Sequence, residues 1–169
     1  MNYKLDLERE KELIKFCSIL NIQGTVFDII YFVGAYTPDN DENQLSASFS
    51  GNFLQSLFVK FLKINSFAPL FIFQNLFKNN LINKNAKVIF FSSLAGSISN
   101  RGKLKHNLKG GNKFYRISKS SLNSGVKNIA YDLDHTNIKI VCLRPGWVKI
   151  ISGDVNADLN IDNSVENIR

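Results

Sequence analysis

Hydrophobic and polar residues follow two different periods along this chain, and the two periods alternate. Three short apolar runs, 26–33, 87–91 and 138–143, predict strands. The first is rich in β-branched and aromatic residues, which is typical of a strand buried on both faces of a parallel sheet. Between the three runs, apolar residues recur at intervals of three and four over 53–79 and 115–134, which predicts two long helices. This order predicts an α/β fold with right-handed crossovers.

The first residues predict a strand end followed by a helix. Residues 3–6 have the character of a strand that is ending, and Asp6 can cap the helix that follows. This helix should run to about Leu20, because Gly24 lies shortly beyond it. Its expected apolar stripe consists of Leu13, Ile14, Cys17 and Leu20.

Polar segments connect the predicted elements. Residues 34–52 should form a loop, and residues 99–113 a flexible insertion. Gly110 and Gly111 predict a flexible lid or insertion hinge rather than a phosphate cradle, because no strand precedes them. Pro69 predicts a kink or a division in the helix over 53–79. Residues 152–169 form a polar tail with weak helical character near 164–168, and the whole chain is expected to be one domain.

Small and polar residues follow each predicted strand. Gly34 comes after the first strand, Ser92 and Ser93 after the second, and Pro145 and Gly146 after the third. Ligands of parallel α/β sheets bind outside the carboxyl ends of the strands. We therefore expect the functional site at this edge.

Tyr115 and Lys119 open the helix between the second and third strands. Their spacing of four places the phenol and the ammonium on one helix face, where the ammonium can lower the pKa of the phenol. Such a phenol can donate or accept a proton. The spacing alone is weak evidence, since a half-buried tyrosine beside a solvated lysine is the ordinary interpretation. Its position after Ser93 and before Pro145 and Gly146 makes a catalytic interpretation credible.

Three motifs carry a resemblance to a known family. Residues 92–98 read SSLAGSI, residues 115–123 read YRISKSSLN, and residues 144–148 read RPGWV. In this order and setting the chain resembles the short-chain dehydrogenase/reductase family, and within it the C-factor-like, carbonyl-reductase-like branch, which the tail over 156–165 also resembles. The resemblance covers most of the chain and is strongest over 87–149.

The resemblance implies a role for each matching residue. Tyr115 would be the general acid that protonates a carbonyl oxygen, and Lys119 would depress its pKa. Ser93 would hold the carbonyl, although a simple strand-end cap is the alternative. Asn65 matches the asparagine that completes the family's proton relay through water.

The same resemblance implies NADP or NAD as cofactor. Tyr115 and Lys119 would contact its nicotinamide ribose, Pro145 and Gly146 would let the backbone approach the nicotinamide, and Asp6 would contact the adenine, with an N-cap as an equally good interpretation. The family's glycine-rich turn, which holds the pyrophosphate at a helix N-terminus, does not occur in this sequence. We therefore expect little cofactor binding by this chain alone.

Other departures from the family pattern also indicate an incomplete sheet and an incomplete cofactor site. The chain matches a partial, doubly wound, Rossmann-like sheet that lacks the first two β-α units and the last strand. Without the first strand, the strand over 26–33 would become an exposed apolar edge, which predicts marginal stability or self-association. Ile150 stands where the family has a threonine that hydrogen-bonds the carboxamide.

Charge, cysteines and histidines limit the partners and ligands that we expect for this chain. The net charge of +7 could attract nucleic acid, but 16 of the 21 cations are lysines spread along the chain, so we expect no nucleic-acid partner. Cys17 and Cys142 lie in apolar settings and predict buried thiols in a reducing compartment. His106 and His135 predict solvated loop residues, and no metal-ligand spacing is present.

The start of the chain does not have the pattern of a signal peptide, and the most apolar stretch, 64–77, is too short to span a bilayer. The expected location is cytoplasmic, without a membrane partner. The first hypothesis is an oxidoreductase acting on a small carbonyl or alcohol substrate, completed by a separate N-terminal half. The second is a non-catalytic remnant that serves in oligomerisation, since the helices over 53–79 and 115–134 match the family's usual homo-oligomer interface.

Overall fold

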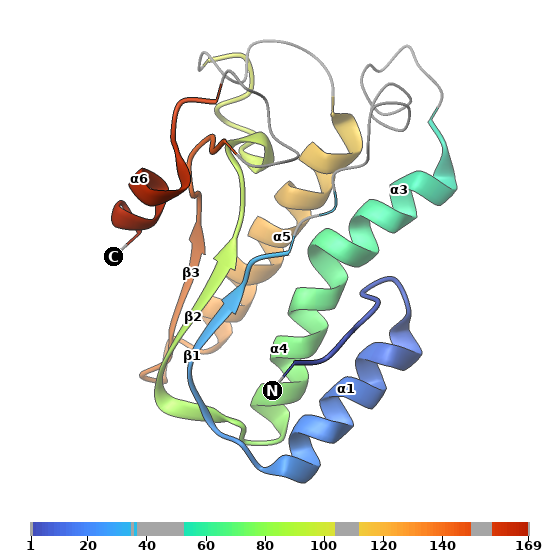
Figure 1. Cartoon of the computed structure of the whole chain (residues 1–169), viewed down its shortest axis with the longest axis vertical. Helices are drawn as coiled ribbons and strands as arrows, with labels where there is room; N and C mark the ends of the chain where they lie inside the picture. The colour runs from blue at the N-terminus through green and yellow to red at the C-terminus, as the bar shows by residue number, and fades with distance from the viewer. Residues whose placement is uncertain (1, 35, 37–52, 104–111, 150–156, 169) are drawn as a thin grey trace.

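Three parallel strands and a layer of helices make up the described fold. The computed structural model describes residues 2–34, 36, 53–103, 112–149 and 157–168 (Figure 1). The sheet has the order β1 (Phe27–Phe32), β2 (Ile82–Phe91) and β3 (Lys139–Leu143). The predicted α/β class and partial Rossmann-like sheet are therefore confirmed. The expectations for His106, Gly110, Gly111 and Ile150, and for most of 34–52 and 99–113, lie outside the described residues.

Strand β2 begins five residues earlier than its hydrophobic run predicts. Phe27 on β1 pairs with Ile82, and the register then shifts so that Ile30 pairs with Val88 and Phe32 with Phe90. The first part of β2 was not predicted because its polar residues, Asn83 to Asn85, lack the apolar pattern of a buried strand. Strand β3 lies within the predicted range.

Helix α1 (Glu10–Gln23) begins later than predicted, and residues 2–6 form no strand. Arg9 is its N-cap residue, so the N-cap interpretation of Asp6 is wrong. Asp6 instead closes a local turn one step earlier, where its Oδ1 accepts a hydrogen bond from the Glu8 backbone N–H at 2.9 Å. Gly24 ends the helix in the left-handed region with φ of 63°.

The second helix is continuous but changes its winding at one turn. It runs through α3 (Gln55–Leu62), the π-helical turn η1 (Lys63–Phe67) and α4 (Ala68–Lys78). Pro69 lies just after the π turn and cannot donate to the carbonyl of Asn65 four residues earlier. The irregularity predicted from Pro69 is therefore present as a π turn, and Asn65 lies inside it.

The length of this helix concerns the expectation that the most apolar stretch is too short to span a bilayer. Residues 55–78 together are 24 residues long and contain an 18-residue window with a mean hydropathy of 1.4, so by length and composition alone they could cross a membrane. The shorter range considered from the sequence missed this because it stopped short of α3. The core helix of a soluble protein meets the same criterion, and Ile72, Phe73 and Leu76 are buried here against the other described elements.

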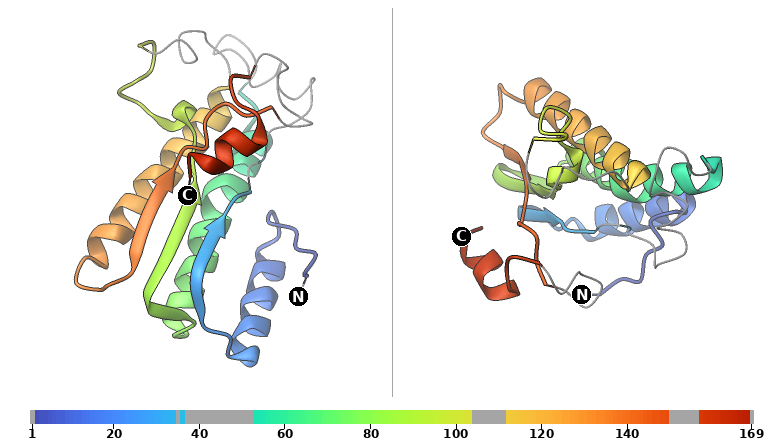
Figure 2. Two further views of the ribbon diagram at one scale, coloured as in Figure 1. Left: turned by 60° about the vertical axis from the view of Figure 1, so that its left-hand side comes forward. Right: turned by 90° about the horizontal axis from the view of Figure 1, so that it is seen from above.

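The helices cover one face of the sheet. Figure 2 shows α1, α4 and α5 (Lys113–Asp132) on one side, while α6 (Ile161–Glu166) lies on the other side near the end of β3. Ile30, Phe32, Val88 and Phe90 pack toward the helices. The opposite face of the sheet is exposed, and Tyr31 on β1 is 55% exposed there. The predicted burial of the strand over 26–33 on both faces is therefore wrong.

Strand β1 is an edge of the described sheet, as predicted for the strand over 26–33. Two residues predicted to be buried are exposed to solvent: Ile14 on α1 at 50%, and Cys142 on β3, whose thiol is still partly buried near Lys119. Cys142 is exposed because β3 is the other edge, with β2 as its only described neighbour. Cys17 is buried as predicted, and His135 is exposed.

Candidate active site

The predicted site lies at the carboxyl ends of the strands. Ser93 follows β2, Tyr115 and Lys119 lie in the first turns of α5, and Pro145 and Gly146 follow β3. In Figure 1 all three strands point toward the same end of the molecule, where these segments meet. The structure therefore brings most of the predicted residues to one edge.

The Ser93 side chain lies beside the phenol of Tyr115, where hydrogen bonding lowers the pKa of that phenol in part. Ser93 has an extended backbone, and its Oγ also accepts from the Ala95 backbone N–H at 3.1 Å. It thus caps the 3-10 turn η2 (Leu94–Gly96) while its hydroxyl contacts the phenol. The two interpretations of Ser93, cap and site residue, are compatible.

A close contact between η2 and α5 fixes this geometry. A Cβ atom at Gly96 would lie 2.8 Å from the backbone carbon of Lys119, so only glycine permits this approach. The Gly96 carbonyl accepts hydrogen bonds from Ser120 Oγ at 3.0 Å and Asn123 Nδ2 at 3.2 Å. Asn123 Oδ1 accepts from Ser92 Oγ. Asn123 is a structural contributor that the sequence interpretation missed, and its signal was a polar residue on the buried side of α5.

Lys119 is a fully buried lysine, 1% exposed. Its Nζ donates to the carbonyl of Phe91 at 2.8 Å and lies 5.9 Å from the centroid of the Tyr115 ring. Burial lowers the pKa of Lys119 to about 8, and the nearby thiol of Cys142 raises it in part. The side chain therefore carries its charge into the interior at neutral pH and is poised to release a proton in mildly alkaline solution.

The pKa of Tyr115 does not follow the expectation from the sequence. Burial raises it above the ordinary value of 10, and the hydrogen bond with Ser93 lowers it only in part. The predicted depression by Lys119 is therefore wrong for this structure. The physical reason is that the ammonium hydrogen-bonds the Phe91 carbonyl and lies over the ring face of Tyr115.

Asn65 joins the long helix to α5 next to the site. It is 1% exposed, and its Nδ2 donates to Ser118 Oγ at 3.0 Å and to the Tyr36 carbonyl at 3.2 Å. Its Oδ1 accepts from the Tyr36 backbone N–H at 2.6 Å. The Asn65 side chain thus contacts the residue before Lys119, with no hydrogen bond to Lys119 itself among the described residues. Ser118 and Tyr36 were not foreseen from the sequence.

Pro145 and Gly146 form a turn that the tail covers. Gly146 has φ of 95°, and a Cβ atom there would lie 2.4 Å from Leu159 Cδ1. Ser164 Oγ donates to the Pro145 carbonyl at 2.7 Å, and Val148 forms a parallel bridge with Leu159. The space beside Gly146 is therefore occupied by Leu159.

Asp6 lies apart from the other candidates. Its carboxylate accepts from the Glu8 N–H and pairs with Arg9 at 3.3 Å. Among the described residues, no interaction connects Asp6 to Ser93, Tyr115 or Lys119. The structure therefore does not bring Asp6 into the group formed by the other residues.

The residues fit a dinucleotide cofactor at one end only. Among the described residues, the Phe91 carbonyl accounts for one of the three N–H donors of Lys119, which leaves donors for the hydroxyls of a ribose. The turn at Gly146 is filled by Leu159, and the sequence contains no glycine-rich turn for a pyrophosphate. The residues around Lys119 therefore fit the nicotinamide ribose of the cofactor, and the described residues offer no matching turn for its pyrophosphate.

The structure is a partial Rossmann-like sheet with Ser93, Tyr115 and Lys119 at its carboxyl edge. No family model matches the chain. An uncharacterised oxidoreductase of Saccharomyces cerevisiae is 30% identical over 118 residues, covering 68% of this chain and 44% of that protein. The C-signal protein of Myxococcus xanthus is 39% identical over 67 residues, covering 40% of each chain.

Solved structures agree with these relatives. A short-chain dehydrogenase/reductase of Burkholderia multivorans with bound NADP has 26% identity and a TM-score of 0.79, with 98% of this chain and 65% of that chain covered. The carbonyl reductase Sniffer of Drosophila melanogaster has the same fold, with 23% identity, a TM-score of 0.77, and 98% and 67% coverage. In sequence and fold the chain is therefore similar to short-chain dehydrogenases/reductases. It spans less than half the length of the two curated relatives.

Proposed function

We propose that this chain carries the catalytic part of an NADP- or NAD-dependent oxidoreductase that interconverts a small carbonyl compound and its alcohol. The observation that carries this proposal is that Ser93, Tyr115 and the buried ammonium of Lys119 lie together at the carboxyl edge of the sheet, where Ser93 lowers the pKa of Tyr115 and Lys119 Nζ lies 5.9 Å from the Tyr115 ring centroid. The similarity of this chain to a short-chain dehydrogenase/reductase with bound NADP and to a carbonyl reductase supports the choice of reaction.

The three side chains divide the proton chemistry. In reduction, Tyr115 donates its phenolic proton to the carbonyl oxygen, and the Ser93 hydroxyl holds that oxygen in place. The Ser93 hydroxyl, which lowers the pKa of Tyr115, stabilises the phenolate that remains, and the buried ammonium of Lys119 lies 5.9 Å from its ring centroid. The nicotinamide cofactor, when bound, supplies the hydride. Lys119, with its pKa near 8, can then return a proton toward Tyr115.

Asn65 supports this arrangement from the other side of α5. Its hydrogen bond to Ser118 fixes the π turn against the helix turn that carries Lys119. We propose that the turn at Asn65 holds a water that supplies protons to Lys119, as the family resemblance implies. π-helical turns inside helices occur frequently at functional sites, which agrees with this role.

The phosphate end of the cofactor requires another polypeptide segment. We propose that 169 residues act as one incomplete domain, with a cytoplasmic location, and that a segment bearing the glycine-rich turn completes it. Pro145 and Gly146 remain the candidates for contact with the nicotinamide, once Leu159 moves from the turn. Asp6 remains a candidate for adenine contact, although its carboxylate pairs with Arg9.

A chimera tests this proposal. The segment of the Burkholderia multivorans protein that carries its glycine-rich turn, which the family resemblance places before the aligned region, is fused upstream of Met1. We expect micromolar NADPH binding by fluorescence and NADPH-dependent reduction of small aldehydes by the chimera, with neither in the chain alone. Strong NADPH binding by the chain alone, or a folded chimera that binds without turnover, would contradict the proposal.

A second candidate function is self-association through α4 and α5. A hollow between these helices is lined mostly by apolar side chains, and Phe67 and Phe77 on its margin are 42% and 36% exposed. Exposed apolar surface of this kind marks interaction sites. We propose that a second copy packs on this helix pair, which accords with the homo-oligomer expected from the sequence.

A further inference from the structure

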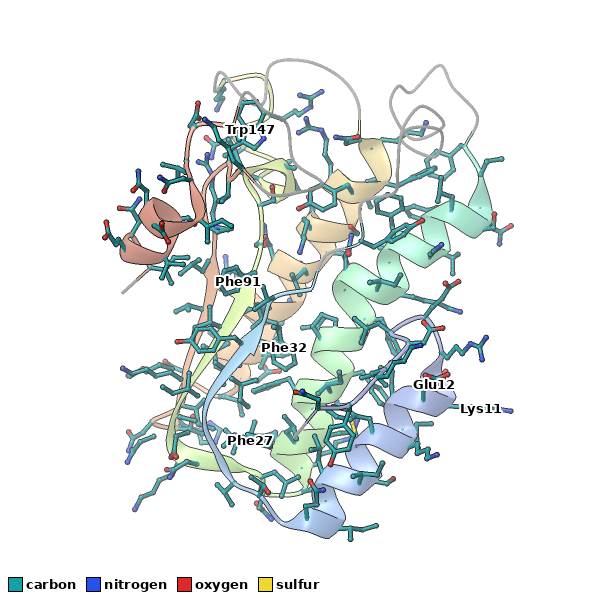
Figure 3. All side chains as sticks on the ribbon, in the orientation of Figure 1. Lys11, Glu12, Phe27, Phe32, Phe91 and Trp147 are labelled. Carbon is teal, nitrogen blue, oxygen red and sulfur yellow. The ribbon has the colours of Figure 1, made fainter. Side chains whose placement is uncertain are left out.

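One asparagine on α5 holds the chain on both sides of Ser93. Asn123 Oδ1 accepts a hydrogen bond from Ser92 Oγ, and Asn123 Nδ2 donates to the Gly96 carbonyl at 3.2 Å. Ser93 lies between these two attachment points, in the segment that follows β2. Figure 3 shows Phe91 at the end of β2, where this segment begins. Asn123 therefore fixes the chain before and after a candidate site residue.

The other side chains of α5 that reach this segment each hold one end of it. Lys119 donates to the carbonyl of the last β2 residue at 2.8 Å, and Ser120 Oγ donates to the Gly96 carbonyl at 3.0 Å. A Cβ atom on Gly96 would lie 3.0 Å from Asn123 Nδ2, so the amide is packed closely against this turn. Among the described residues, Asn123 is thus the one side chain with hydrogen bonds on both sides of Ser93.

The identity of the residue at position 123 needs a reason. The Gly96 carbonyl does not depend on Asn123 for a donor, since Ser120 supplies one. Asparagine is also a weaker helix former than leucine, and position 123 lies inside the 20-residue helix α5. A residue that departs from the local preference is expected to have another role. The bond to Ser92 is what Asn123 adds.

The direction of the Ser93 hydroxyl depends on this segment. Ser93 has an extended backbone with φ of −146°, and its Oγ accepts from the Ala95 N–H at 3.1 Å. One lone pair is used in this way, which leaves the O–H of Ser93 for the phenol of Tyr115. A hydrogen bond of this kind lowers the pKa of the phenol, because it favours the phenolate. A movement of the chain at Ser92 or Gly96 would turn the O–H away from the phenol.

We propose that Asn123 is a positioning residue of the candidate active site. Its amide holds the chain on both sides of Ser93 and so keeps the Ser93 hydroxyl directed at the Tyr115 phenol. This inference deepens the proposed function, and its consequence for turnover rests on that function. The alternative is that Asn123 only anchors η2 on α5, which predicts a loss of stability without an effect on the Tyr115 phenol.

The test is the titration of the phenol at position 115 in the full chain. Difluorotyrosine replaces Tyr115, because its phenol is more acidic and titrates at lower pH, and fluorine NMR follows this one side chain. Ser93→Ala removes the hydroxyl itself and should raise the pKa of the phenol, which sets the reference. Asn123→Leu should raise this pKa by at least about half as much, and the double variant should add nothing to Ser93→Ala alone.

Matched variants separate positioning from anchoring. Asn128→Leu should leave the titration unchanged, because Asn128 is an exposed asparagine on the same helix whose Nδ2 donates to the Ser124 carbonyl. Ser92→Ala removes one of the two bonds to Asn123 and should shift the titration in the same direction, so it decides the question if Asn123→Leu does not fold.

Three results would overturn the inference. They are an Asn123→Leu chain that titrates like its parent, an additive double variant, and an equal shift in Asn128→Leu. The assay contains no cofactor and no substrate. Absence of turnover in the chimera would therefore contradict the proposed function alone, while the titration still decides whether Asn123 acts on Tyr115 through Ser93.

Discussion

Lys119 destabilises the folded chain at neutral pH because its ammonium is buried. The side chain is 1% exposed, and burial lowers its pKa from 10.5 to about 8. A depression of this size corresponds to about 3 kcal/mol between the two protonation states. We predict that Lys119→Met removes this cost and loses about 1 kcal/mol, because the Phe91 carbonyl loses its donor. The variant should therefore be about 2 kcal/mol more stable than the wild type at pH 7.

The pH dependence gives the sharper test. Between pH 8 and 10.5 the unfolded lysine keeps its proton while the folded one loses it, so the stability of the wild type rises with pH. The slope approaches about 1.4 kcal/mol per pH unit. Above pH 9 burial of Cys17 and Cys142, which raises both thiol pKa values, acts in the opposite direction in both proteins. The advantage of Lys119→Met should thus shrink by about 1 kcal/mol from pH 8 to 9.

The assay is urea unfolding at pH 7, 8 and 9 for the wild type and the variant. The control is Lys127→Met, an exposed lysine on the same helix, which should show no pH-dependent difference. A difference between wild type and Lys119→Met that does not change from pH 7 to 9 would refute the reasoning. So would a variant that is less stable than the wild type at pH 7.

Two other predictions concern the packing around the site and the assembly. Gly96→Ala should lower the free energy of unfolding by about 1–3 kcal/mol in thermal or urea unfolding, because the new Cβ would lie 2.8 Å from the Lys119 backbone. Gly125→Ala should be nearly neutral, since its Cβ would meet the movable end of the Leu70 side chain. Equal losses of stability in the two variants would contradict this reasoning. The chain should elute as more than a monomer in size-exclusion chromatography with light scattering, and Phe67→Glu should reduce the assembly while Ile22→Glu, at an 85% exposed site, should not. A sharp monomer peak with cooperative melting would exclude this self-association.

Much of the fold could be predicted from apolar periodicity, because the strands and long helices bury regular stripes. The runs over 87–91 and 138–143 became β2 and β3, and the spacing over 115–134 became α5 within two residues at either end. Periodicity could not predict the start of β2, where the strand is polar, or the later start of α1. It also could not reveal that one face of the sheet is open, because an apolar strand has the same pattern whether or not a partner covers it.

For the candidate site, the positions of the residues could be predicted from the sequence, but their pKa values could not. The positions of Ser93, Tyr115 and Lys119 at one edge follow from strand ends and helix starts, and the effect of the Ser93 side chain on the pKa of Tyr115 agrees with this. The electrostatics were not predictable from spacing, because burial dominates the pKa of both Tyr115 and Lys119. The contact of Leu159 with Gly146 comes from a distant segment, and no local pattern reports such a contact.

We propose Tyr115 as the proton donor of a carbonyl reduction. The most direct measurement is the rate of NADPH-dependent aldehyde reduction by the chimera with Tyr115→Phe, compared with Tyr131→Phe, an 83% exposed tyrosine on the same helix. We predict a loss of kcat of about 10²–10⁴-fold for Tyr115→Phe with little change in NADPH affinity, and no loss for Tyr131→Phe. Turnover that survives Tyr115→Phe at the rate of the parent chimera would contradict the account.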